Sequence, residues 1–143
     1  MTLVDRFNEY AADFELTFVD DDWQRLAQYF TEDTAYSTPA NGMLVPGREK
    51  AFATLRAAVS GFDRRCDSRR LMTTAGPTQE GDEVSREWIA HFTLGGAPDL
   101  EIDGSERARF RGDQSALLEV TPTAETLARL TQYASTHLLS RSR

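Results

Sequence analysis

The stretch between Phe30 and Gly47 constrains the fold most, because the sequence changes its secondary-structure pattern twice within it. A helical pattern ends at Phe30, and after a short polar break the run 35–38 has the composition of a strand. Pro46 and Gly47 then precede another helical pattern over 48–59. Downstream, the chain shows only strand patterns until one last helix. This order predicts an α+β protein in which helices come first and a mostly antiparallel sheet follows.

The expected helices are marked by apolar residues spaced three and four apart, which places them on one helix face. Asp20 to Asp22 would cap the second helix, because side-chain oxygens accept hydrogen bonds from the free N–H groups at a helix start. Pro122 and Thr123 would begin the last helix. The four apolar faces consist of Leu3, Phe7, Tyr10, Phe14 and Phe18; of Trp23, Leu26, Ala27 and Phe30; of Phe52, Leu55 and Val59; and of Leu127, Leu130, Ala134 and Leu138.

Four strands are expected at 65–74, 83–94, 100–111 and 115–121, separated by glycine-containing turns. Short turns make neighbouring strands antiparallel. Side chains alternate between the two faces of a strand, and the almost wholly apolar set is the inward one. In the second and third of these strands the inward sets are Val84, Arg86, Trp88, Ala90, Phe92 and Leu94, and Leu100, Ile102, Gly104, Glu106, Ala108 and Phe110.

Two charged residues, Arg86 and Glu106, therefore fall among inward apolar side chains. A buried unpaired charge is costly, so such residues pair, lose their charge or line a wet pocket. We expect Arg86 to pair with Glu106, because adjacent antiparallel strands bring inward residues side by side. A hairpin centred near Ala97 would put Arg86 opposite Ala108 and diagonal to Glu106. Glu119, in the last strand, is the alternative partner, and its neighbours leave its face open.

The 143 residues correspond in length to a single domain spanning 1–143. A net charge of −7 argues against nucleic acid or an anionic membrane as a partner. The single Cys66 allows no internal disulfide, and the first residues do not read as a signal peptide, so we expect a cytoplasmic location. His91 and His137 lie far apart and without carboxylates at ligand spacing, so we expect neither a metal nor a cofactor.

Charge is distributed unevenly along the chain. Residues 1–33 are rich in Asp and Glu, whereas 48–70 are rich in Arg. Such blocks could pair between two copies of the chain or steer a charged ligand. We interpret them instead as two solvated faces of opposite sign.

The order of elements, anchored on Phe30-Thr31-Glu32-Asp33 and Ser37-Thr38-Pro39, resembles that of the nuclear transport factor 2-like superfamily, and within it the SnoaL-like and ketosteroid isomerase-like proteins. The resemblance covers roughly residues 5–122. It implies a cone-shaped, cystatin-like fold in which a curved, mostly antiparallel sheet wraps around the N-terminal helices, with a pocket at the open end. The ligand-binding candidates for this pocket are Tyr10, Phe14, Trp23, Tyr36, Thr38 and Trp88.

The same resemblance bears on catalysis. Ketosteroid isomerases carry their general base where this chain has Thr38, and their oxyanion tyrosine about where it has Phe14. Both substitutions argue against steroid isomerase activity. The neutral aspartate of the isomerase oxyanion hole falls near Glu106.

Other members of the superfamily use different residues. Limonene epoxide hydrolase-like proteins need an arginine and two aspartates, which correspond here to Arg86, Trp88 and Glu119. SnoaL-type cyclases rely on an aspartate or histidine in the last strands, a role open to Glu119. The catalytic candidates are therefore Glu106, Glu119 and Arg86.

Two functions remain open. The chain is either a binder of a small apolar ligand or a cofactor-free acid/base enzyme such as an isomerase, cyclase or hydratase. In the enzyme, Glu106 or Glu119 would be the acid or base, with Arg86 tuning it or holding an oxyanion. The lack of a base at Thr38 and the bulk of Trp88 favour the binder, whose Arg86 pair would be structural.

The outer sheet face is expected to carry Ile89, with Ala116, Leu118 and Val120 if the last strand alternates regularly. Such a face is too apolar to be turned to water. We therefore expect a homodimer with two-fold symmetry that pairs through this face, as superfamily members commonly do.

Overall fold

The computed structural model describes residues 2–37 and 42–138. Its helical elements are α1 (Leu3–Asp20), the 3₁₀ helix η1 (Trp23–Tyr29), α2 (Arg48–Gly61), the short η2 (Asp63–Arg65), α3 (Ala124–Tyr133) and the π-helical turn η3 (Ala134–Leu138). Its strands are β1 (Phe30–Ser37), β2 (Leu44–Pro46), β3 (Ser68–Glu80), β4 (Glu83–Thr93), β5 (Leu100–Arg111) and β6 (Gln114–Pro122). Within this part of the chain, none of the helices combines the length and the apolarity that a membrane crossing demands.

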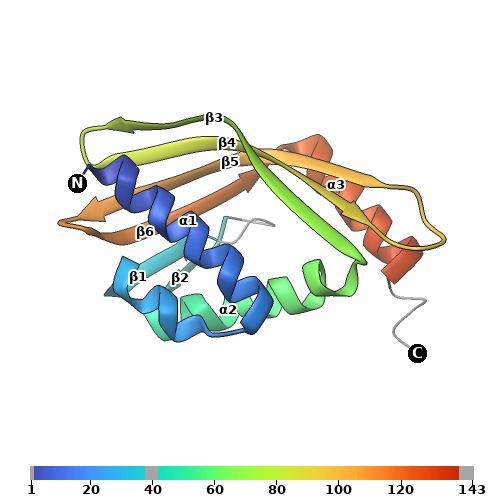
Figure 1. Ribbon diagram of the computed structural model, residues 1–143, viewed down its shortest axis with the longest axis horizontal. Coiled ribbons are helices and arrows are strands. Elements are labelled where there is room, and N and C mark those ends of the chain that lie inside the picture. Colours follow the sequence, from blue (N-terminus) through green and yellow to red (C-terminus); the bar gives the residue numbers. More distant parts are fainter. Residues whose placement is uncertain (1, 38–41, 139–143) are drawn as a thin grey trace.

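The strands form one six-stranded sheet in the order β2-β1-β6-β5-β4-β3. Neighbours are antiparallel except β1 and β6, which run parallel. The sheet is curved and unclosed, with α1 lying across one face and α2 below it (Figure 1). α3 follows β6 and packs near the turn between β4 and β5 (Figure 1). The expected α+β architecture, with helices first and a curved sheet around them, is confirmed.

The ends of the helices follow from their capping residues. Thr2 and Asp5 satisfy each other's backbone N–H groups at the start of α1, with hydrogen bonds of 3.1 Å and 3.0 Å. The Thr123 hydroxyl accepts a hydrogen bond from the Thr126 N–H, at 3.2 Å, and so starts α3. Both caps satisfy N–H groups that would otherwise lack a partner.

The prediction that an aspartate side chain caps the second helix is wrong. Asp22 makes no side-chain capping bond, and the segment that follows is a 3₁₀ helix. Asp21 ends α1 instead, with a left-handed backbone at φ 61°. This conformation lets its carboxylate accept hydrogen bonds from the Trp23 indole at 2.7 Å and from Arg64 at 3.0 Å, so Asp21 ties the end of α1 to η1 and η2.

The core lies between the sheet and the helices. One cluster, which includes the fully buried Phe7 and Leu26, lies beneath α1 and α2. A second cluster, built around Trp88, Phe92 and Tyr133, lies toward α3. The predicted inward sets of β4 and β5 are confirmed, because every apolar member of both is buried.

Two register predictions need correction. β4 and β5 pair about Gly96, which has φ +81°, so Arg86 lies directly opposite Glu106 and not opposite Ala108. Glycine adopts this backbone readily, which moves the turn centre from Ala97.

In β6, the regular alternation breaks at a bulge near Ala116. Leu118 consequently pairs with the inward Ala108 and is buried, and Val120 also lies inside. The outer face is therefore less apolar than expected.

Gly104 is a tight packing point in the sheet. A Cβ there would lie 2.5 Å from the Thr121 carbonyl oxygen and 2.7 Å from Pro122 Cα. We expect Gly104→Ala to lower the free energy of unfolding by about 1–3 kcal/mol, because the backbone must shift to make room. At the end of α2, Gly61→Ala meets nothing within 4 Å and should leave stability unchanged or raise it by up to ~1 kcal/mol. Urea denaturation measures both, and equal values would contradict this packing.

Candidate functional site

A cavity of about 470 Å³ opens between the helices and the inner face of the sheet. α1 and α2 supply one wall, β3 to β6 supply the other, and Leu130 of α3 closes one side. The size is typical of sites for small molecules. Its lining is mainly apolar and includes Tyr10, Phe14, Tyr36, Leu55, Phe62, Leu71, Trp88, Phe92, Ile102 and Val120.

Arg86 and Glu106 form an ion pair in the cavity wall. Their direct pairing across β4 and β5 brings Arg86 Nε to 2.8 Å and Nη2 to 2.7 Å from Glu106 Oε1. The two side chains are only 12% and 7% exposed, so water screens the pair weakly. Arg86 Nη1 also donates to Thr73 Oγ1 at 3.2 Å, and its guanidinium lies 5.2 Å above the Phe7 ring. One arginine thus neutralises one carboxylate, and contacts from three elements hold it in place.

Two tyrosines add hydroxyl groups to the cavity lining. Tyr10 and Tyr36 are both buried, and burial raises the pKa of each phenol above its usual value, with the Glu106 charge adding to the effect. The phenols therefore stay protonated at neutral pH. They can donate hydrogen bonds to an oxygen atom of a bound molecule.

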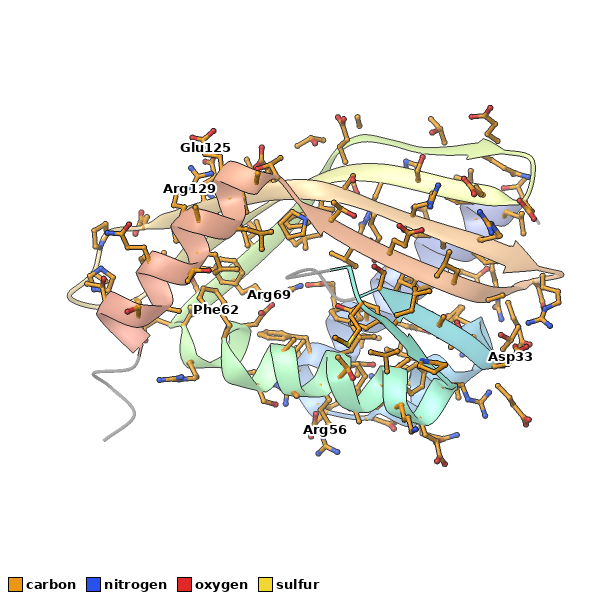
Figure 2. The ribbon with its side chains drawn as sticks, turned by 180° about the vertical axis from the view of Figure 1, so that it is seen from behind. Asp33, Arg56, Phe62, Arg69, Glu125 and Arg129 are labelled. Carbon is orange, nitrogen blue, oxygen red and sulfur yellow. The ribbon has the colours of Figure 1, made fainter. Side chains whose placement is uncertain are left out.

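The cavity wall contains a second polar cluster, which the sequence patterns did not predict. Arg69 of β3 donates from Nε to Asp63 at 2.7 Å and from Nη1 to Glu15 of α1 at 2.6 Å. Its side chain is 4% exposed, and its guanidinium lies 4.8 Å from the Phe18 ring centroid. Both Arg69 and Phe62, labelled in Figure 2, line the cavity. Burial raises the pKa of Asp63, and the Arg69 charge opposes this effect.

The uneven charge distribution was the signal for this cluster. The basic block at 48–70 and the acidic block at 1–33 meet within one chain, because Arg69 binds Glu15 while Arg56 and Arg64 bind Asp21. Our interpretation of two solvated faces is wrong for Arg69, which is buried. The two blocks pair inside one chain, an alternative to pairing between two copies.

The structure brings together six of the predicted site residues. Tyr10, Phe14, Tyr36, Arg86, Trp88 and Glu106 all line the cavity. Trp23 does not line it. Its ring packs 5.9 Å from that of Phe14 in the buried core. Thr38 lies outside the described residues.

Glu119 lies on the opposite face of the sheet, where it pairs with Arg107. The bulge near Ala116 sets this direction, since Arg107 points outward directly across from it. His91 is also outward, with Nδ1 3.6 Å from a Glu101 oxygen. Among residues 2–37 and 42–138, no group of three or more His, Cys, Asp or Glu side chains could hold a metal ion.

Comparison with solved structures identifies the architecture. An NTF2-like protein of unknown function from Exiguobacterium sp. 255-15 superposes with a TM-score of 0.60 at 20% identity, covering 86% of this chain and 99% of that one. A ketosteroid isomerase-like protein from Catenulispora acidiphila, solved with trimethylamine, gives a TM-score of 0.61 at 19% identity, covering 85% and 91%. The chain has the nuclear transport factor 2-like fold.

A protein proposed to be a SnoaL-like polyketide cyclase, from Shewanella denitrificans OS-217, has the same fold. It matches with a TM-score of 0.64 at 15% identity, covering 87% of this chain and 96% of that one. No protein-family model matches the sequence, and no curated protein matches it. At such low identity, the nuclear transport factor 2-like fold is what these structures share, and function must be argued from the cavity itself.

The buried ion pair allows a direct test of the strand faces. Arg86→Ala would leave the Glu106 carboxylate buried without its partner, and we expect a loss of about 3–5 kcal/mol in the free energy of unfolding. Arg107→Ala, whose side chain is 43% exposed on the outer face, should cost no more than about 1 kcal/mol. Chemical denaturation of both variants measures the contrast. If both variants lose equally little free energy of unfolding, the buried Arg86–Glu106 pair is refuted.

Proposed function

We propose that the chain binds a small, largely apolar molecule in the cavity between α1, α2 and the sheet. The observation that carries this proposal is the cavity of about 470 Å³ with its mainly aromatic and aliphatic lining. Cavities of this size and character favour binding through burial of apolar surface. The neighbouring protein solved with trimethylamine supports the use of this fold for a small ligand.

Binding is favoured over catalysis by the state of the polar groups. Glu106 is neutralised by Arg86 at 2.7 Å, so its charge is already engaged before any ligand arrives. Trp88 is buried, and its side chain fills space beside Gly104, at the position where the hydrolase-like pattern would need an aspartate. Cys66 offers no activated thiolate, because burial raises its pKa.

The expected cytoplasmic location stays a prediction.

A second candidate is a cofactor-free acid/base enzyme, and one arrangement favours it. A carboxylate, an arginine and two protonated phenols converge on the same apolar cavity. In such an enzyme Glu106 would take a proton from the substrate, while Arg86 or the phenol of Tyr36 would stabilise the developing oxyanion. Since Glu119 faces away, this candidate is built on Glu106 and Arg86.

Two neighbouring alanines of α2 provide a matched test of binding. Ala58 lines the cavity, whereas Ala57 does not, and both side chains are exposed. We expect one neutral fluorescent N-phenyl-1-naphthylamine to bind per chain, with affinity lowered at least tenfold by Ala58→Trp, which blocks the opening. Ala57→Trp should bind like the original protein.

Native mass spectrometry of freshly purified protein completes the test. A small molecule that is released on denaturation would identify the physiological ligand. If the protein converts this molecule into another compound during incubation, the result favours the enzyme. Probe binding that is equal in the two tryptophan variants would count against the cavity, and so would no binding at all.

We also propose that two copies pair through the outer sheet face. This face carries Met72, which is 41% exposed, with Ile89 and Leu117 among charges of both signs. A surface that mixes both signs can complement itself about a two-fold axis. It is also hollowed by a groove of about 410 Å³, which is lined in part by Ile89, Ser105 and Thr121.

Light scattering tests the dimer. We expect a mass near twice the 16.0 kDa of one chain at micromolar concentration. Ile89→Asp should shift the mass toward a single chain, because it places charge in the contact. Leu16→Asp, at a 55% exposed position on α1, should leave the mass unchanged. A single-chain mass for the original protein would refute the dimer.

A further inference from the structure

We propose that Trp88 is a ligand-contacting residue whose indole N–H donates a hydrogen bond to a neutral acceptor atom of an aromatic molecule. The acceptor would be a ring nitrogen or an ether oxygen. The proposal rests on the proposed function, because it requires the cavity to bind a small, largely apolar molecule. It adds the chemical class of that molecule and the residue that selects it.

The indole of Trp88 lies on the inner face of the sheet, in the wall of the cavity. Trp88 belongs to the inward set of β4, is 6% exposed and lines the cavity. Gly104 lies directly opposite it on β5, and a Cβ at Gly104 would lie 2.8 Å from Trp88 Cζ2. Because glycine has no side chain there, the indole extends over β5. Packing in the cluster that includes Phe92 and Tyr133 then holds the ring, and with it the direction of its N–H.

The N–H of this indole has no partner in the part of the chain that the structure describes: no carbonyl or side-chain atom there accepts a hydrogen bond from Trp88 Nε1. Nor is Nε1 sealed in the core, since among the described residues only the Thr34 hydroxyl is an enclosed side-chain polar atom without a partner. Nε1 therefore borders open space. Trp88 also borders the groove on the outer face, but its side chain is turned inward, so that space is the cavity. Buried donors are almost always satisfied, and we expect a bound molecule to supply the acceptor.

An indole N–H determines the kind of group that can bind it. It donates a hydrogen bond and cannot accept one, whereas the hydroxyls of Tyr10 and Tyr36 can do either. The ligand atom that faces Trp88 must therefore carry a lone pair. Trp23, the other tryptophan of the chain, has the same group satisfied within the protein, because its N–H is donated to Asp21 Oδ1 at 2.7 Å.

The charges of the cavity favour a neutral acceptor. Its described lining contains three carboxylates, from Glu15, Asp63 and Glu106, and two guanidinium groups, from Arg69 and Arg86. Each carboxylate accepts a hydrogen bond from one of these arginines, at 2.6–2.8 Å, as an ionised acid does. The lining thus has one more negative than positive charge. Anionic acceptors such as carboxylates and phenolates are repelled, and neutral ones are not.

The apolar walls favour an aromatic body for the ligand. Phe92 and Phe62 line the cavity with Trp88, and their two rings lie 5.0 Å apart in an edge-on arrangement. Flat rings pack on such side chains in offset or edge-on geometry. The lone pair of a ring nitrogen lies in the plane of the ligand and at its edge, where an indole N–H can meet it without any added bulk.

The two tryptophans allow a direct spectroscopic test. In a nitrogen-15-labelled sample each indole N–H gives its own signal, and replacing either tryptophan by phenylalanine assigns both. We expect quinoline at pH 8, where it is uncharged, to shift the Trp88 signal downfield, because the proton enters a hydrogen bond. Naphthalene has the same shape without the nitrogen and should not cause this downfield shift. The Trp23 signal is the internal control and should stay in place with both probes, since its N–H is already bonded to Asp21.

Affinities measure how much the contact contributes to binding. Both probes compete with bound N-phenyl-1-naphthylamine, and its displacement gives their affinities. Trp88→Phe keeps an aromatic side chain and removes the donor, so the affinity for quinoline relative to naphthalene should fall about fivefold or more. Trp23→Phe should leave this ratio unchanged, because Trp23 does not line the cavity. The anionic probe 2-naphthoate should bind the original protein more weakly than quinoline does.

The outcomes separate this inference from the proposed function. If both probes bind but quinoline moves the Trp88 signal no further downfield than naphthalene does, the Trp88 contact is refuted while the ligand-binding cavity stands. An unchanged affinity ratio in Trp88→Phe also refutes the contact, and 2-naphthoate binding as tight as that of quinoline refutes the neutral class. If neither N-phenyl-1-naphthylamine nor the two probes bind, both proposals fall. The titration of the original protein decides the matter even if Trp88→Phe does not fold.

Discussion

The buried pair between Arg86 and Glu106 is the constraint on which the sheet depends. Both charges lie on the inner face, directly opposite each other in β4 and β5. A slip of one residue in either strand would turn that strand's charge and its apolar set to the wrong face. A slip of two would keep the faces but separate the charges, leaving each one buried alone. The apolar pattern thus selects the face, and the ion pair selects the register.

The arginines of the cavity also explain how a small domain keeps a cavity inside its core. An apolar wall alone would gain from collapse, because empty space forfeits contacts between side chains. Here Arg69 joins α1 to η2 and β3, and Arg86 joins β3, β4 and β5. These charged groups remain satisfied only at their present separation. They act as spacers between the helices and the sheet.

The sequence predicted what local periodicity controls. Alternation along β4 and β5 placed Arg86 and Glu106 inside, and the helix patterns found α1 and α2. The prediction that Glu119 belongs to the cavity site is wrong, because the bulge at Ala116 reverses the alternation of β6 and leaves no clear local signal. The sequence patterns also gave no indication that Asp63 and Arg69 line the cavity. Asp63 lies in a three-residue turn with no periodicity, and Glu15 lies 54 residues before Arg69.

The function depends on the polar groups in the cavity, such as the clusters around Arg69 and Arg86, and not on the fold alone. The solved structures compared above match at 20% identity or less, and they share the frame of helices and curved sheet. The frame fixes where a cavity forms, because the sheet curves around α1 and α2. What the cavity can do depends on how charges are balanced within it. Arg86 pairs with a single carboxylate, that of Glu106, whereas Arg69 is shared by two, those of Asp63 and Glu15. Proteins with the same frame can therefore differ in what they bind or convert, because the polar side chains set into the cavity wall differ.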